Sequence, residues 1–125
     1  DVAALGVTVS GELGAPATIS VNPGTAEPTE TRIVVLARGA GEPITAQDTV
    51  GINRAVTTWD NSVFESTWDI GAPSRITVSA APDLTGLVGV PVGSRVVMVQ
   101  AAGTDANGTT VPACAYVIDI ETKLR

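Results

Sequence analysis

Side chains able to act as nucleophiles, bases or metal ligands are few in this 125-residue chain, and histidine is absent. Without histidine, neither a Ser-His-Asp nor a Cys-His system can be assembled, and the commonest transition-metal ligand is missing. The one cysteine, Cys114, lies in the apolar run Ala113–Val117, with no neighbouring group that would lower its thiol pKa. The pattern therefore predicts a buried structural thiol.

Acidic residues form two close pairs in the sequence, Glu65 with Asp69 and Asp119 with Glu121. Paired carboxylates can share a proton, but in a small β domain they are usually solvated or cap turns. Residues 105–108 are similar to part of a calcium loop, yet a tyrosine stands where a bidentate glutamate would close it. We therefore expect solvated carboxylates, no metal and no cofactor.

The composition favours a folded domain with an aliphatic core. Hydrophobic residues make up 44% of the chain and charged residues only 16%, whereas a disordered chain is polar and highly charged. The aromatic residues are two Trp, one Tyr and one Phe. The core must therefore consist mainly of Val, Ile, Leu and Ala, and the β-branched members of this set favour strands. The length suits a single domain.

The net charge of −6 comes from 13 acidic and 7 basic residues. This balance would not attract nucleic acid or an anionic membrane, so we expect neither as a partner. No apolar stretch is long enough to span a bilayer, and no contact of this domain itself with a membrane is expected. Because the chain begins at Asp1 without Met or a signal peptide, we expect a mature fragment or an excised domain.

Short apolar runs separated by 13 Gly and 8 Pro predict a mostly β domain. We expect strands over residues 7–10, 17–21, 30–38, 48–59, 62–68, 75–79, 94–101 and 115–121. The one helix expected covers residues 82–88. Pro82 suits its first turn, and Leu84, Leu87 and Val88 would face the sheet. A sheet wrapped on a helix and a plain β-sandwich both fit this local pattern.

Five segments together resemble one protein family, because they occur in that family's order and with nearly its spacing. They are Val9–Pro16 (VSGELGAP), Gly41–Val50 (GEPITAQDTV), Trp59–Pro73 (WDNSVFESTWDIGAP), Gly86–Val96 (GLVGVPVGSRV) and Ala115–Ile120 (AYVIDI). The family is that of FKBP-type peptidyl-prolyl isomerase domains, in its actinobacterial secreted or lipoprotein form. Its version of the third segment is WDxGxxFDSSWDRGxP, one residue longer. The resemblance covers nearly the whole chain.

This resemblance implies an α+β fold, in which an antiparallel and strongly twisted sheet wraps around one short helix, the 82–88 segment. Residues 1–40 would supply lead-in strands that pack on the sheet, and residues 41–125 would form the FKBP-like core. The chain would then be one compact domain of a longer, possibly tandem, protein. In the family, the prolyl pocket lies between the sheet and the helix.

Catalysis in this family requires no covalent chemistry. Rotation about an X–Pro amide meets a barrier of about 18–20 kcal/mol because twisting breaks resonance. A pocket that favours the twisted amide lowers the barrier, and aromatic walls supply much of the apolar burial. By resemblance, Phe64 stands at the family's pocket Phe, Glu65 at the Asp that follows it, and Ile118 at the Phe of the last strand.

The other pocket positions differ from the family. Ile70 stands where an Arg pairs with the acidic residue, and Asp83 falls near the Trp that floors the pocket. Arg54 aligns with the first-strand Tyr, Ser74 with the next pocket Phe, and Ala106 with the loop Tyr. No residue is assigned as catalytic. The resemblance therefore implies a degenerate active site with weak or absent isomerase activity.

Three functions remain open from the sequence. The first is an FKBP-type isomerase-like domain, weak or inactive as a catalyst, that acts as a protein-binding or scaffold module outside the cytoplasm. It would be secreted or lipoprotein-anchored in the cell envelope. The second is an active peptidyl-prolyl isomerase or folding helper, and the third is an unrelated β-sandwich module for adhesion or cell-wall binding. For an FKBP-type domain, the expected partners are proline-containing peptides or protein segments and other envelope proteins.

Overall fold

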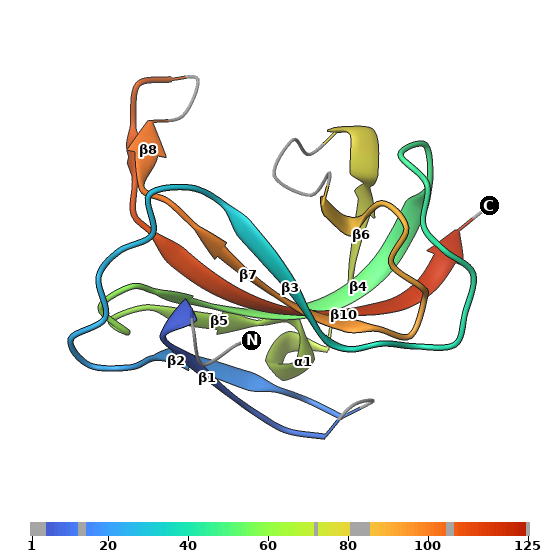
Figure 1. Ribbon diagram of the computed structural model, residues 1–125, viewed down its shortest axis with the longest axis horizontal. Coiled ribbons are helices and arrows are strands. Elements are labelled where there is room, and N and C mark those ends of the chain that lie inside the picture. The colour runs from blue at the N-terminus through green and yellow to red at the C-terminus, as the bar shows by residue number, and fades with distance from the viewer. Residues whose placement is uncertain (1–4, 13–14, 72, 81–85, 105–106, 125) are drawn as a thin grey trace.

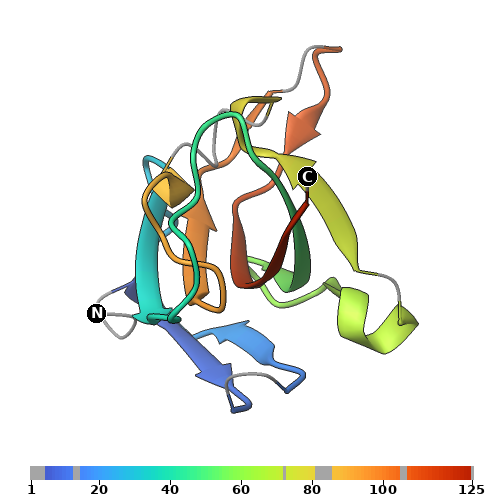
Figure 2. The ribbon, with the colours of Figure 1, turned by 90° about the vertical axis from the view of Figure 1, so that its right-hand side faces the viewer.

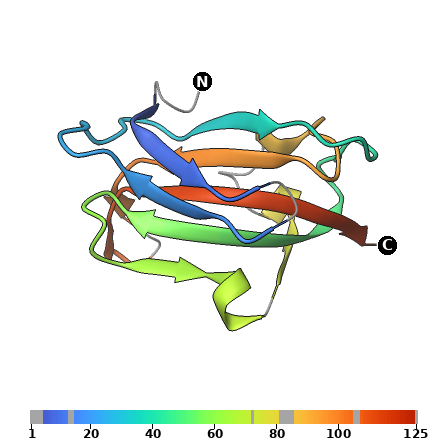
Figure 3. The same cartoon turned by 90° about the horizontal axis from the view of Figure 1, so that it is seen from below.

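The main element of the fold is an antiparallel sheet with strand order β3-β7-β10-β4-β5, in which β6 also pairs with β4. A computed structural model of the chain describes residues 5–12, 15–71, 73–80, 86–104 and 107–124. The strands of the main sheet are β3 (Arg32–Ala37), β4 (Thr49–Thr58), β5 (Phe64–Ser66), β6 (Ser74–Thr77), β7 (Arg95–Gln100) and β10 (Cys114–Leu124). Figure 3 shows β3 at one margin of this sheet and β5 at the other.

Two hairpins complete the described strands. One pairs β1 (Val7–Ser10) with β2 (Thr18–Val21), and the other pairs β8 (Gly103–Thr104) with β9 (Thr110–Val111). The first lies across one face of the main sheet, and β8 projects beyond an end of it (Figure 1). The sequence pattern did not predict β8 and β9, because strands of two residues carry no alternating apolar signal. Among the described residues, no helix is long and apolar enough to cross a membrane.

The main sheet buries side chains on both of its faces, because successive residues of a strand point to opposite sides. One face packs against the β1–β2 hairpin through Val7, Ile19, Val21, Val97, Val99, Ala115 and Val117. The opposite face packs against the segments that follow β3 and β6 through Ile44, Val78, Leu87, Val96, Ile118 and Ile120. Figure 2 shows the hairpin beneath the sheet, with the cyan β3 on the left and the yellow-green α1 at the right. The continuous apolar runs of β7 and β10 are explained by this burial from two sides.

The α-helix of the described residues, α1 (Thr67–Ile70), begins where the sequence pattern predicted the end of a strand. A short 3₁₀ helix, Val78–Ala80, follows β6. The Thr67 hydroxyl accepts a hydrogen bond from the Arg54 N–H at 2.8 Å, so a side chain takes the place of strand pairing at this position. Gly71 ends the helix in the left-handed conformation, with φ of 64°, and its N–H points to the carbonyl oxygens of Thr67 and Trp68. This single turn separates β5 from β6 along the same side of β4.

The helix predicted over residues 82–88 lies largely outside the described residues, which resume at Gly86. Leu87 is completely buried in the core, in agreement with the expectation that it faces the sheet. Val88, which we also expected to face the sheet, is 49% exposed. The reason is that the chain turns here. Gly89 has a φ of 89°, and its N–H donates to the Ile44 carbonyl at 2.8 Å.

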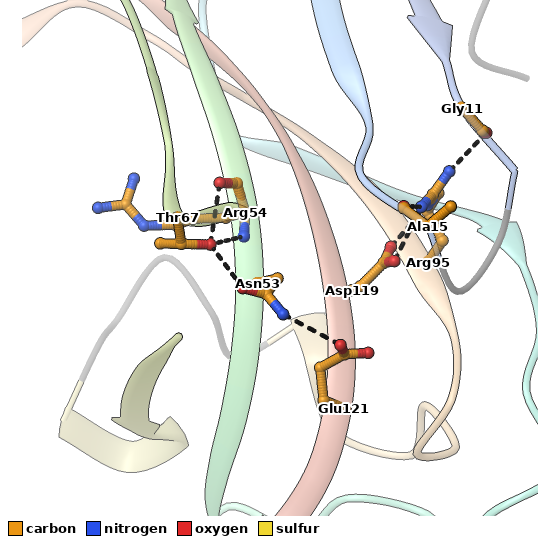
Figure 4. A network of polar contacts seen from close by, with 8 residues as sticks. All are labelled: Gly11, Ala15, Asn53, Arg54, Thr67, Arg95, Asp119 and Glu121. Atoms are coloured by element: carbon orange, nitrogen blue, oxygen red, sulfur yellow. Dashed lines mark hydrogen bonds and ion pairs between the residues drawn. The ribbon is translucent and has the colours of Figure 1, made fainter. Parts of the chain in front are cut away.

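A buried ion pair joins the hairpin to the main sheet. Arg95 on β7 and Asp119 on β10 lie opposite each other and are each 2% exposed. The Arg95 Nε and Nη2 atoms donate to the two carboxylate oxygens of Asp119 at 2.6 and 2.8 Å. The guanidinium also donates to the carbonyl oxygens of Gly11 and Ala15, at 2.7 and 2.8 Å, and lies 6.0 Å from the Trp68 ring centre. Figure 4 shows the hydrogen bonds to Asp119, Gly11 and Ala15 converging on the Arg95 side chain.

The expectation that Asp119 is solvated is therefore wrong. Its partner is 24 residues away in the sequence, so no local pattern marks the pair. Glu121, by contrast, is exposed and accepts a hydrogen bond from the Asn53 amide at 3.0 Å. The register of β10 against β4 shifts between Ile120 and Thr122, so Glu121 itself is the extra residue of a bulge.

We expect Arg95→Met to destabilise the domain by about 3–5 kcal/mol, because it leaves the Asp119 charge buried without a partner. The double variant Arg95→Met/Asp119→Leu should regain part of this loss, since an apolar pair of similar volume removes the buried charge. Urea unfolding followed by tryptophan fluorescence measures both changes. A single variant as stable as the unmodified chain would show that the ion pair does not hold the hairpin.

Candidate functional site

A hollow of about 290 Å³ opens where β5 meets α1, at one margin of the main sheet. Its walls are Phe64, Glu65 and Ser66 of β5, Thr67, Asp69 and Ile70 of α1, and Arg54 of β4. The Phe64 side chain is 42% exposed and that of Ile70 is 73% exposed. The site is therefore a shallow surface with one aromatic wall.

The turn before β5 is held by the Asp60 carboxylate. One oxygen of Asp60 accepts hydrogen bonds from the Ser62 hydroxyl at 2.6 Å, the Thr58 hydroxyl at 2.8 Å and the Ser62 N–H at 3.0 Å. These bonds, that of the Ser62 hydroxyl first, lower the pKa of Asp60 from 3.8 to about 2. An ionised Asp60 thus fixes the direction in which the chain enters the hollow.

Asn61 connects the same turn to the β1–β2 hairpin. Its backbone has a φ of 60°, a conformation that asparagine tolerates better than most residues. Its side-chain amide accepts from the Val21 N–H and donates to the Val21 carbonyl, both at 2.9 Å. The amide group therefore pairs with β2 as a backbone unit would, and it ties the turn before β5 to the β1–β2 hairpin.

A chain of polar side chains anchors α1 to β4. The Thr67 hydroxyl donates to the Asn53 side-chain oxygen at 2.9 Å, while it accepts from the Arg54 N–H (Figure 4). The Asn53 amide group in turn donates to Glu121. Every one of these atoms has a partner, as buried polar groups require. The floor of the hollow is thereby fixed relative to the sheet.

The charges of the hollow are one guanidinium and two carboxylates. The Arg54 guanidinium carbon lies 5.8 Å from the Tyr116 ring centre, which is within the range of a cation–π contact. Glu65 and Asp69 are exposed. Within the described part of the chain, neither carboxylate forms a hydrogen bond or an ion pair. The hollow therefore carries an excess of negative charge on its rim.

Of the positions singled out by the family resemblance, the structure brings Arg54, Phe64, Glu65 and Ile70 together in this hollow. It does not place Ile118 there. Ile118 is 2% exposed in the core and lies opposite Arg54 in register.

Strand alternation explains the separation of Phe64 from Ile118. Phe64 lies opposite Thr57 on β4, whereas Ile118 lies opposite Arg54, which shares a face of β4 with Val56. Thr57 is on the other face, since successive residues of a strand alternate. Phe64 and Ile118 therefore point to opposite faces of the sheet. A pocket that needs both side chains on one face does not form.

The remaining predicted positions are dispersed or undescribed. Ser74 is half-buried at the start of β6, opposite Ile52. Asp83 and Ala106 lie outside the described residues. Sequence reasoning did not single out Thr67, which anchors the hollow. The one local signal for it was Gly71, a residue type that commonly follows the end of a helix.

The prediction for the lone cysteine can be compared with the structure directly. Cys114 is a free, buried cysteine, as predicted, and its burial raises the pKa of the thiol. Among the described residues, no group of three or more His, Cys, Asp or Glu side chains is arranged to hold a metal ion.

The Asp60 turn gives a pH prediction. In the folded chain the Asp60 carboxyl should titrate near 2, and in Ser62→Ala its pKa should rise toward 3.8 because the strongest hydrogen bond is lost. Since the folded pKa is lowered, the stabilisation is complete above pH 3.8 and disappears as the pH falls toward about 2. Carboxyl-carbon NMR across this pH range measures the titration. Ser79→Ala, an exposed serine remote in sequence, is the control, and an Asp60 pKa near 3.8 in the unmodified chain would contradict the prediction.

Comparisons with known proteins identify the fold. No family model and no curated protein sequence matches the chain. Among solved structures, FkpA from Escherichia coli matches with a TM-score of 0.63 at 19% identity, over 82% of this chain and 52% of FkpA. The N-terminal domain of FKBP42 from Arabidopsis thaliana matches with a TM-score of 0.61 at 12% identity, over 85% and 99% of the two chains. AtFKBP13 matches with a TM-score of 0.59 at 14% identity, over 78% and 96%.

The chain thus spans about half the length of FkpA and nearly the full length of the other two matched chains. The identities are low, so the likeness concerns the path of the backbone. The twisted antiparallel sheet expected from the sequence resemblance is confirmed by these matches. This chain has the FKBP fold.

Proposed function

We propose that this chain is an FKBP-type peptidyl-prolyl isomerase-like domain that binds proline-containing segments of other proteins and is weak or inactive as a catalyst. The observation that carries the proposal is the hollow at β5 and α1. It gathers Arg54, Phe64, Glu65 and Ile70, which the sequence resemblance assigns to the family's prolyl pocket, but it has a single aromatic wall.

The geometry of the hollow favours binding over catalysis. A pocket lowers the barrier to amide rotation when it surrounds the proline with apolar groups and excludes water. Phe64 and Ile70 are both substantially exposed, and Ile118 is buried in the core away from the hollow. A proline ring placed against Phe64 would lose water on one side only. Such a site supplies some affinity but little preference for the twisted amide.

A second candidate function, an active isomerase or folding helper, is favoured by the position of Tyr116. This tyrosine lies next to Arg54, on the same face of the sheet as Ile118. It could supply an aromatic group to the hollow, whereas the sequence resemblance places the pocket Tyr at Ala106. The third candidate, an unrelated β-sandwich, is disfavoured by the likeness to FKBP structures.

We further propose that the domain acts outside the cytoplasm, secreted or lipoprotein-anchored, where other envelope proteins would be its partners. The support is the resemblance of Val9–Pro16 to the lead-in of actinobacterial FKBP-type members. Arg95 hydrogen-bonds to Gly11 and Ala15 within this segment, so the lead-in packs as part of the domain. The degenerate pocket and the tandem arrangement belong to the same proposal.

The test is a nitrogen-15 NMR titration of the 125-residue chain with the peptide Ala-Leu-Pro-Phe. We expect shifts at Phe64, Glu65 and Ile70, and cis–trans exchange far slower than with an intact FKBP enzyme. Phe64→Ala should weaken binding about tenfold, because it removes the one aromatic wall.

Val88→Ala is the matched control, since Val88 is a similarly exposed apolar residue outside the hollow. It should leave peptide binding unchanged. Exchange as fast as that of an intact enzyme would favour the second candidate function. Absence of any peptide-induced shift would overturn the proposal.

A further inference from the structure

The outer edge of β5 offers backbone groups that β4 does not use. The Thr58 N–H donates to the Val63 carbonyl at 3.1 Å, which makes these residues a hydrogen-bonded pair. Hydrogen-bonded and non-hydrogen-bonded pairs alternate along antiparallel strands. Glu65, opposite Val56, is therefore the next hydrogen-bonded position, and the backbone groups of Phe64 point away from β4.

This edge is open within the described part of the chain. No hydrogen bond of the Phe64 N–H or carbonyl is found there. β5 is the last strand at its margin of the sheet, and α1 stands beside its end as a wall (Figure 3). An extended peptide placed along the edge would pair with Phe64 and meet the exposed Ile70 side chain at one end.

The negative charge of the hollow between β5 and α1 favours peptides that carry a positive charge. Glu65 and Asp69 line the same hollow and have no partner among the described residues. The one cation of the hollow, Arg54, already packs against Tyr116. Unlike Asp48, whose carboxylate is 3.1 Å from the Lys123 ammonium, these two carboxylates are not neutralised by a neighbour. The net charge of −6 adds a field of the same sign.

We infer that the hollow takes an extended peptide bearing Lys or Arg, which adds to the free edge of β5 as a further strand. Its apolar side chain packs against Phe64 and Ile70, and its cation lies between Glu65 and Asp69. The inference rests on the proposed peptide-binding function and adds the mode of binding and the charge of the partner. An acidic peptide is repelled by the same two carboxylates.

The test compares three peptides, Ala-Leu-Pro-Phe flanked on both sides by Lys, by Ala or by Glu, in NMR titrations at low salt. The Lys-flanked peptide should bind about fivefold more tightly than the Ala-flanked one, and the Glu-flanked peptide more weakly than either. The difference should vanish at about 1 M salt, where exposed charges are screened. Amide exchange at Phe64 should slow on binding, whereas that at Glu65, already bonded to β4, should not.

The variant Glu65→Lys/Asp69→Lys should reverse the preference, so that the Glu-flanked peptide binds best. Glu27→Lys/Glu30→Lys makes the same change in net charge elsewhere on the surface and should leave the preference intact. If the charge-reversed variant does not fold, Glu65→Gln/Asp69→Asn should abolish the preference.

The outcomes separate the inference from the function on which it rests. Failure of all three peptides to bind overturns both. Equal binding of the three at low salt, or an unchanged preference after charge reversal, overturns the inference while the peptide-binding function stands. Binding that leaves Phe64 amide exchange unaltered overturns strand addition.

Discussion

The layers of this domain meet at one buried cation, Arg95. Its guanidinium group binds Asp119 on the neighbouring strand, two carbonyls of the β1–β2 loop and the face of Trp68 on α1. A buried charge is tolerated only when its hydrogen-bonding capacity is satisfied, so these contacts must form together. The hairpin, the central sheet and the helical turn beside the hollow therefore depend on a common contact. Any movement of the hairpin away from the sheet would expose Arg95 and loosen the wall of the site.

The central strands could be predicted from the sequence because their apolar runs report burial directly. β7 and β10 are covered on both faces, which requires continuous hydrophobic sequence, and both were expected close to their observed positions. The turn at Thr67 could not be predicted in this way. There a hydroxyl group replaces a backbone partner, and one helical turn is too short for a 3.6-residue period to be visible. The burial of Asp119 was missed for a related reason, since its stabilisation comes from a partner on another strand.

The site was predictable only in part, because the sequence does not show how the strands are aligned with one another. That alignment decides which residues of neighbouring strands share a face of the sheet. Matching positions to a family pattern identified Phe64 and Glu65, and both line the hollow. The same matching grouped Ile118 with Phe64, although the pleat places them on different faces of the sheet. A sequence pattern can be matched one residue at a time. A pocket, however, forms only when side chains from several strands lie on the same face of the sheet. The hollow consequently gathers four positions that the sequence resemblance singled out, while Ile118 stays in the core.

The two edge strands of the main sheet, β3 and β5, are protected in different ways against pairing with other chains. An unpaired edge invites pairing with other chains, and proteins protect such edges with bulges, short strands and charges. At β3, the register shifts between Val35 and Ala37 and so interrupts the ladder. At β5, the strand is three residues long and carries Glu65 beside Asp69. For a chain of net charge −6, these carboxylates oppose pairing with another copy of itself. They leave the edge accessible to a cationic segment, so that protection against self-association and selection of a partner follow from the same two charges.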